Sequence, residues 1–310
     1  MDMRPTRAIG LLAIAGALCA QDAATFSADV KVVNLLATVR DRDGKVVKGL
    51  TKDDFIITED GRPQSIRYFT QESDLPLTVG LLVDTSRSMQ TVFEPERVAT
   101  VKFLDQVLRE DRDLAFVMHF DIGVGVLQGF TSSKEELAAA LAKLKIPKIP
   151  STLLYDAIAK ASTDLMKTQS GRKAFILLSD GMDVRSKTSI GTAIEYAQRA
   201  DTIIYTVLFS HRMGRPGRGG GNKAARNRQQ QKGPRVMQRL ARETGGGYFA
   251  VSEENPIDKI YAQIEEELRN QYSIGYTPDR PDGDKQFRKI TLTTKRQDLV
   301  IRTREGYYPK

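Results

Sequence analysis

Four apolar runs in the middle of the chain constrain its fold more than any other feature. LTVGLLVD at 77–84 and KAFILLSD at 173–180 are almost free of polar residues, and DLAFVMHFD at 113–121 and TIIYTVLF at 202–209 are similar. Strands of a parallel sheet have this composition because helices cover both of their faces. We therefore expect these runs to form strands that are buried on both sides.

Helical patterns separate or follow these runs. A capping box from Ser132 to Glu135 predicts the start of one helix. Three stripes of apolar residues have helical spacing: Val101, Leu104 and Leu108; Leu137, Leu141 and Leu144; and Ile257, Ile260, Tyr261, Ile264 and Leu268. Strands that alternate with helices predict an α/β fold, in which an open, mostly parallel sheet carries helices on both faces.

Short strands are expected on both sides of this α/β part. The segment 21–72 contains two apolar runs that turn at Asp43-Gly44 and at Asp60-Gly61, which are hairpin signals. Strand patterns return in 271–310, in YSIGYTP, KITLTT and DLVIRTREGYY. Neither segment alone has enough strands for an independent core. We therefore predict that residues 73–270 are inserted between two segments that pack together as a small β-rich domain.

The first 20 residues have the features of a secretory signal peptide. Arg4 and Arg7 precede an apolar run that ends in small residues before Gln21, which favours cleavage near Ala20 over a buried N-terminal helix. The run is shorter than the roughly 20 residues of a membrane span, and no later stretch reaches that length. Cys19 is the only cysteine, so the cleaved chain can form no disulfide. We expect an exported protein, periplasmic or secreted, without a membrane span.

Oxygen-bearing side chains gather at the predicted ends of these strands. The carboxyl ends of parallel strands share one edge of the sheet, where ligands bind. Five side chains are placed at that edge by the strand ends and by a helix that opens in STLLYDA: Asp84, Ser86, Ser88, Thr152 and Asp180. All of them offer hard oxygen ligands and none offers sulfur or imidazole. Such a set suits a divalent cation, Mg²⁺ first, with Mn²⁺ or Ca²⁺ as alternatives, rather than zinc.

Two other roles are open to these serines. Helix N-capping is the simplest role for Ser86 and Ser88 taken alone. A nucleophilic Ser86 needs a base, but His119 lies in an apolar strand, His211 lies in a basic segment, and no G-x-S-x-G motif is present. The metal site is preferred because Thr152 and Asp180 place further oxygens at the same edge of the sheet.

The motifs DTSRS at 84–88, STLLYDA at 151–157 and LLSDGMD at 177–183 resemble those of von Willebrand factor type A domains. The resemblance covers about 73–270, and the flanks resemble β segments of bacterial exported proteins with such a domain. It implies a Rossmann-like sheet and a metal-ion-dependent adhesion site. There Ser86, Ser88 and Thr152 would bind a divalent ion, supported by Asp84 and Asp180 directly or through water. It also implies a protein ligand that offers a carboxylate to the ion.

Two positions depart from the family pattern. Arg87 and Ser151 stand where glycine is common, and neither departure removes a ligand. We expect Arg87, Ser151 and Asp183 to line the approach of a partner. Asp183 has the alternative role of closing a turn.

The segment 211–235 fits no element. It carries eight Lys or Arg and no acid, which accounts for the chain's formal net charge of +8. It is either a solvated linker or a docking strip for an acidic protein or an anionic envelope polymer, and salt would weaken such a contact. Nucleic acid is not expected, because no aromatic residues are interleaved for base stacking.

These features predict an exported, non-enzymatic adhesion or assembly module that binds a protein through a divalent ion. One alternative is a metal-dependent phosphoryl hydrolase on the same sheet. Such phosphatases typically need a second acid where this chain has Ser86, and no general base is visible. The other alternative is a structural envelope protein in which the metal only stabilises the fold.

Overall fold

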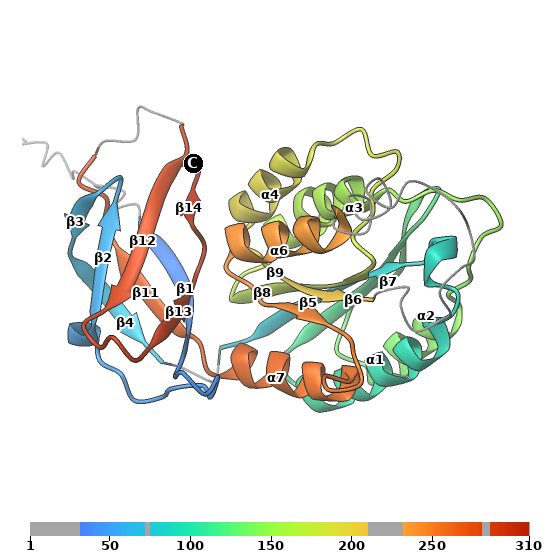
Figure 1. Ribbon diagram of the computed structural model, residues 1–310, viewed down its shortest axis with the longest axis horizontal. Coiled ribbons are helices and arrows are strands. Elements are labelled where there is room, and N and C mark those ends of the chain that lie inside the picture. The colour runs from blue at the N-terminus through green and yellow to red at the C-terminus, as the bar shows by residue number, and fades with distance from the viewer. Residues whose placement is uncertain (1–31, 72–74, 210–231, 281–285, 310) are drawn as a thin grey trace, which may run out of the picture. The chain divides into compact units, whose positions relative to one another are not determined.

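The computed structural model describes residues 32–71, 75–209, 232–280 and 286–309. A six-stranded sheet forms the centre of the α/β part, in the order β10-β9-β8-β5-β6-β7 (Figure 1). Its strands are β5 (Leu77–Asp84), β6 (Leu114–Phe120), β7 (Val124–Thr131), β8 (Arg172–Ser179), β9 (Ile203–Leu208) and β10 (Tyr248–Ala250). Only β7 is antiparallel to its neighbour. The four predicted strands are confirmed, and their carboxyl ends lie at one edge.

Helices cover both faces of this sheet, as predicted. One face packs against α1 (Phe93–Val107), α2 (Lys134–Ala142) and α7 (Ile257–Arg269), and the other against α3 (Leu154–Lys160), α4 (Ile190–Arg199) and α6 (Lys232–Thr244). Short 3₁₀ turns occupy Lys52–Asp54, Arg87–Met89 and Met166–Thr168, and a π turn at Ala161–Leu165 extends α3.

The predicted start of α2 was one residue too early. Ser133, not Ser132, is the N-cap, because its extended backbone allows its hydroxyl to accept the N–H of Glu136 at 3.2 Å. That bond satisfies one of the free donors at the helix start.

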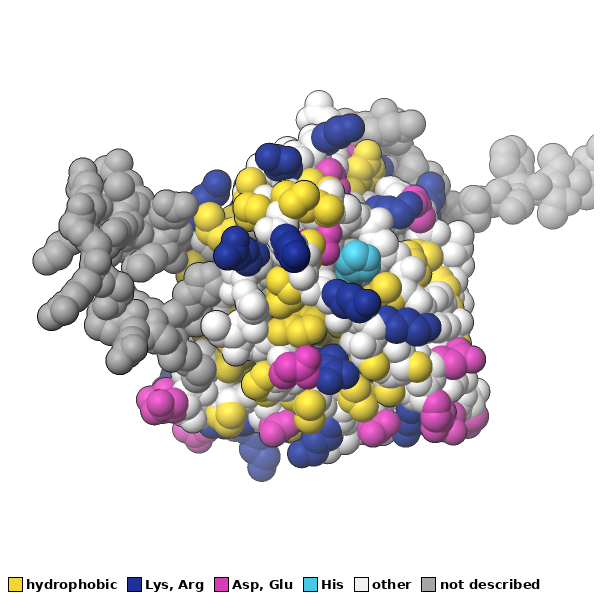
Figure 2. All heavy atoms as spheres, turned by 90° about the vertical axis from the view of Figure 1, so that its right-hand side faces the viewer, with side chains coloured by type: hydrophobic (Ala, Val, Ile, Leu, Met, Phe, Trp, Pro, Cys, Tyr) yellow, Lys and Arg dark blue, Asp and Glu magenta, His cyan; other side chains and the backbone are white. Residues whose placement is uncertain are grey.

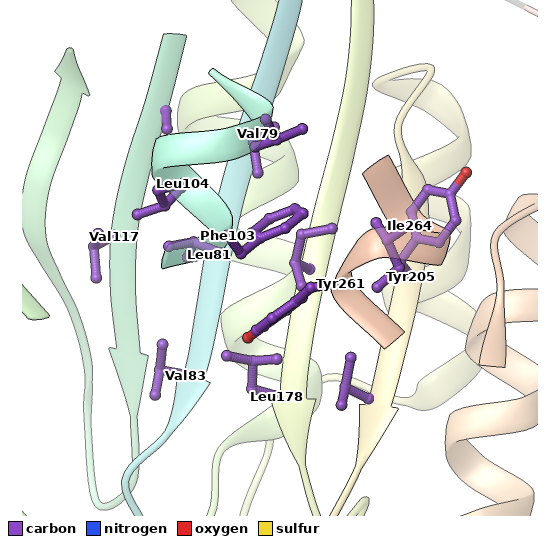
Figure 3. Close-up of a cluster of buried hydrophobic side chains, with 14 of the residues drawn as sticks. Val79, Leu81, Val83, Phe103, Leu104, Val117, Leu178, Tyr205, Tyr261 and Ile264 are labelled. Atoms are coloured by element: carbon purple, nitrogen blue, oxygen red, sulfur yellow. The ribbon is translucent and has the colours of Figure 1, made fainter. Parts of the chain in front are cut away.

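Two apolar layers hold the sheet. In the layer beneath α1 and α7, the rings of Phe103 and Tyr261 stack with centroids 4.5 Å apart, above Val79, Leu81 and Val83 of β5 (Figure 3). The hydroxyl of Tyr261 lies 2.7 Å from that of Thr100, so its polar end is satisfied inside the core. This packing fixes the strands whose ends form the candidate site.

The terminal segments pack together, as the sequence predicted. Two four-stranded sheets have the orders β13-β1-β11-β4 and β14-β12-β2-β3. Each combines strands from both ends of the chain: β1 (Val33–Arg40), β2 (Phe55–Glu59), β3 (Arg62–Gln64), β4 (Ile66–Thr70), β11 (Tyr272–Tyr276), β12 (Arg288–Thr294), β13 (Val300–Arg302) and β14 (Gly306–Tyr307). The β2–β3 hairpin turns at Asp60 and Gly61, whose φ angles are 48° and 80°. Positive φ at both positions is what a tight hairpin turn requires.

A buried carboxylate joins these strands to the α/β part. Glu267, near the end of α7, is fully buried and accepts hydrogen bonds from Arg40 of β1 and Arg302 of β13 at 2.7–3.0 Å. Two cations therefore balance one buried charge, which is the condition under which such a charge is tolerated.

Two predicted segments fall outside the described residues. These are the signal peptide at 1–20 and residues 211–231 of the basic segment. In the described ranges, every helix is too short or too polar to cross a membrane.

Candidate metal site

Asp84 ends β5 and is fully buried. Its Oδ1 accepts the N–H of Ser86 at 2.8 Å, and its Oδ2 accepts the hydroxyl of Ser179 at 2.6 Å. Ser179 ends the neighbouring strand β8, one position beyond the pair Val83–Leu178. The two strand ends are therefore joined at the level where the chain leaves the sheet.

The two serines of the DTSRS motif face each other. Their hydroxyl oxygens are 2.9 Å apart, Ser86 is buried and Ser88 is half-buried. Ser86 stands at the N-cap position of the 3₁₀ turn Arg87–Met89, yet its side chain makes no capping bond. The capping role that the sequence left open is therefore not seen for Ser86, and its hydroxyl is directed to the cluster.

Asp180 and Thr152 reach the same edge from two other loops. Asp180 follows β8, and its Oδ1 accepts the N–H of Met182 at 3.0 Å. Its charge acts on Asp84, which places the two carboxylates near each other. Thr152 is buried, and its carbonyl accepts the N–H of Val184 at 3.0 Å, which ties it to the loop that carries Asp180.

The electrostatics of this edge favour a cation. Burial and, to a smaller extent, the charge of Asp180 raise the pKa of Asp84 to about 7, although hydrogen bonds from Ser179 and Ser86 oppose both effects. A cation beside the two carboxylates would remove this penalty. Within the described ranges, no group of three His, Cys, Asp or Glu residues could hold a metal by itself. An ion at this edge would therefore depend on hydroxyl oxygens, and the residues present fit that requirement.

The three positions predicted to meet a partner differ in exposure. Arg87 is exposed, whereas Ser151 is buried. Asp183 accepts the hydroxyl of Ser186 at 2.5 Å and the N–H of Tyr155 at 3.4 Å. It thereby closes a turn and helps to secure the start of α3, the alternative role that the sequence suggested for it.

Two residues of this region escaped the sequence interpretation. One is Ser179, which Asp84 binds directly. The other is Glu96 of α1, which is buried and has no hydrogen-bond partner for either carboxylate oxygen among the described residues. Burial and the charge of Asp84 raise the pKa of Glu96 well above its usual value. Both left a signal, because Ser179 precedes Asp180 at a strand end and Glu96 lies four and seven residues before Thr100 and Phe103 of the buried stripe.

The described histidine lies beside another hydroxyl. Nδ1 of His119 is 3.4 Å from Oγ1 of Thr85 and 3.5 Å from Oδ2 of Asp121, and Thr85 donates to Asp121 at 2.7 Å. Thr85 is fully buried. This cluster ties the loop after β5 to the end of β6.

Residues 79–263 match the family model described as the von Willebrand factor type A domain. No curated protein sequence matches the chain. Three solved structures illustrate the range of similar folds.

The first is proximal thread matrix protein 1 from the mussel byssus, in a form with a zinc-occupied MIDAS motif. It is 15% identical with a TM-score of 0.51, over 69% of this chain and 50% of the mussel chain. This chain thus spans about half the length of that protein, and the likeness concerns the fold alone.

An aerotolerance-related membrane protein from Bacteroides fragilis NCTC 9343 is 17% identical over 62% of this chain and 98% of its own, with a TM-score of 0.48. The vWF domain of the type V pili tip protein Mfa5 from Porphyromonas gingivalis is 13% identical over 62% and 94%, with a TM-score of 0.45.

Proposed function

Because the chain belongs to the von Willebrand factor type A domain family, we propose that it binds a partner protein through a divalent cation at the carboxyl edge of its sheet. Ser86, Ser88 and Thr152 would hold the ion, with Asp84 and Asp180 acting directly or through water. The observation that supports this most is the pair of facing hydroxyls, 2.9 Å apart, beside the buried carboxylate of Asp84, on which no basic side chain of the described residues acts.

The partner would supply a carboxylate. Hydroxyl ligands are neutral, so an ion held mainly by them keeps most of its positive charge and attracts a further anionic oxygen. The chain's own part is to present the hydroxyls in a fixed arrangement, which the Asp84–Ser179 bond and the packing of β5 provide.

Mg²⁺ is the ion that we propose, with Mn²⁺ and Ca²⁺ as alternatives. The mussel protein was described with zinc at its MIDAS motif. Zinc sites in proteins usually include sulfur or nitrogen ligands, whereas the donors here are all oxygen.

We further propose that the protein is a binding module and not an enzyme, and that its N-terminus directs export. Ser86 stands where the competing phosphoryl hydrolase would need a second acid. Arg4, Arg7 and the apolar run behind them are the basis for export, to the periplasm or out of the cell.

Calorimetric titration of the full chain with Mg²⁺ and Mn²⁺ tests the proposal. We expect saturable binding that is lost in the double variant Ser86→Ala/Ser88→Ala and unchanged in Ser170→Ala, an exposed serine before the start of β8. Equal binding by the double variant would overturn the site.

A second variant separates adhesion from a purely structural metal. If the ion serves a partner, Thr152→Ala in Mg²⁺ should lose partner binding while its melting temperature stays that of the parent chain. A lower melting temperature in Mg²⁺, with partner binding intact, would favour the structural role.

A further inference from the structure

Four loops surround the candidate metal site, and we call them the metal rim: residues 85–92, 121–123, 143–153 and 180–189. Each loop joins two strands, two helices, or a strand and a helix at the carboxyl edge of the sheet. The first carries Ser86 and Ser88, the third carries Thr152, and the fourth carries Asp180. A partner that reaches the ion must touch this rim.

Every exposed charge on the metal rim is positive. Six residues share this property: Arg87, Lys143, Lys145, Lys148, Arg185 and Lys187. The rim also contains three acids, but none of them is exposed. Asp180 is a candidate ligand, Asp121 is buried and accepts from Thr85, and Asp183 accepts from Ser186. On these four loops, the fully exposed charges that a partner meets are therefore all basic.

Three of the four rim loops also expose one large apolar side chain. Ile122, Ile149 and Val184 are 50%, 58% and 60% exposed. Ile149 lies three residues before Thr152, and the backbone N–H of Val184 binds the carbonyl of Thr152. Single exposed apolar residues are common on proteins. Here, however, they occupy separate loops around one point.

Figure 2 views the molecule from the side toward which the parallel strands run in Figure 1. Hydrophobic side chains are interspersed with Lys and Arg over the upper part of that face, and many of the acidic side chains lie toward its lower edge. Acidic side chains are also visible between the Lys and Arg of the upper part.

We infer that the partner segment captured at the metal rim is acidic and apolar. It would carry further Asp or Glu residues, and aliphatic or aromatic ones, around the carboxylate that meets the ion. This inference rests on the proposed function and extends it. A single carboxylate would satisfy the ion but would offer no acid to the exposed cations around it, of which only Lys187 interacts with an acid of the described residues, Asp156. Complementary charge across an interface speeds association and excludes partners of the same charge. The exposed apolar side chains of the rim would form the dry centre of the contact.

Selection from short random peptides, displayed on a carrier and bound to the full chain in Mg²⁺, tests this composition. Peptides released by EDTA should be enriched in Asp and Glu beyond one residue and in aliphatic or aromatic residues. Peptides that EDTA releases but that are neutral or basic would overturn the inference and leave the proposed function standing. Peptides that resist EDTA, or that bind Ser86→Ala/Ser88→Ala equally, would count against the proposed function. A selection that yields no EDTA-released peptide, from a chain that binds Mg²⁺ in calorimetry, would overturn the inference.

A synthesised peptide from that selection then tests the rim residues. Lys148→Gln/Arg185→Gln should weaken its binding about tenfold at low salt and less at high salt. Ile149→Ser should weaken it at both salt concentrations. The control Lys102→Gln, an exposed lysine on α1 outside the rim, should change it by less than about twofold. Equal effects of the control and the rim variants would overturn the inference. A polyanion such as a short DNA that competes equally well, and is indifferent to Ile149→Ser, would do so too.

Discussion

Asp84 is the residue on which the chemistry of the candidate site depends. Its carboxylate is buried, receives two hydrogen bonds and lies near a second carboxylate. The bonds stabilise its charge, while burial and Asp180 destabilise it. The second pair of effects is larger, because the pKa rises from 3.8 to about 7.

Metal binding should therefore release a proton near neutral pH. Below pH 7, Asp84 of the metal-free protein is protonated, and an ion that needs the carboxylate must displace that proton. The affinity for Mg²⁺ should fall by up to about tenfold for each pH unit below 7. Calorimetry in two buffers of different ionisation enthalpy measures the released proton. An affinity that is constant between about pH 5 and pH 7 would contradict this assignment.

Glu96 should make the metal-free protein less stable as pH rises. Its pKa in the folded state lies well above 4.5, so its contribution to stability is fully present below that pH. The contribution is lost as pH rises from 4.5, where Glu96 of the unfolded chain ionises, through the folded pKa. Glu96→Gln mimics the neutral form, so it should match the parent's melting temperature at about pH 4 and exceed it by several degrees well above that pH. Glu94→Gln, an exposed neighbour, should show no such divergence.

The site residues that the sequence predicted belong to local motifs, whereas those it missed are recognised only from tertiary contacts. Asp84, Ser86 and Ser88 stand together in one short motif, and Asp180 ends an apolar run. Ser179 looks like the last residue of that run until its strand is paired with β5. Glu96 looks like a solvated helix charge until α1 is rotated against the sheet. Pairing and rotation are tertiary facts that one strand or helix does not contain.

Among the elements, β5 is the strand that places the site. It lies between β6 and β8, and all eight of its residues are buried. Gly80 sits at its middle, between the rings of Phe116 and Phe175, whose centroids are 6.3 Å apart. A Cβ at this position would approach Phe116 to 2.4 Å and Phe175 to 2.7 Å. The glycine leaves the space that these two rings occupy.

Gly80→Ala should therefore destabilise the protein by about 1–3 kcal/mol, because the rings must leave their rotamers or the strands must separate. Chemical denaturation measures the loss. Gly129→Ala is a matched control on the edge strand β7 of the same sheet, where an added Cβ would meet nothing within 4 Å. If Gly80→Ala is as stable as the control, the core between β5 and its aromatic neighbours is looser than described.

In the central sheet, prediction of the strands succeeded where burial is uniform and failed where it is not. The strands β5, β6, β8 and β9 were predicted because continuous apolar runs are visible without a partner. The edge strand β7 was not, since its sequence VGVLQGFT has two glycines and only partial burial. The three residues of β10 are strand-like only because β9 pairs with them. Edge and short strands depend on their neighbours, so one sequence gives little sign of them.

At the scale of the whole molecule, Glu267 links the α/β part to the flanking strands. Replacing it by Gln would leave Arg40 and Arg302, both half-buried, with no acid between them. Breaking a fully buried pair costs about 3–5 kcal/mol. The cost here should be smaller, because water reaches both arginines, and both parts should lose stability together. Thermal unfolding measures this loss if the melting of the α/β part and that of the flanking strands are followed by separate spectroscopic probes. The control Glu253→Gln changes an exposed acid before α7. An unchanged melting temperature in Glu267→Gln would mean that the link carries no net stability.

The insertion of the α/β part has a consequence in time. Val33 of β1 pairs with Tyr276 of β11, and Ile57 of β2 pairs with Leu292 of β12, so strands made first wait for strands made last. When the ribosome has reached residue 270, every strand of the central sheet has been synthesised, but only two of the four strands of each flanking sheet. During that interval β1 and β2 carry unpaired edges, which are open to wrong partners. The flanking strands are thus the last part of the chain to mature, although synthesis begins with them.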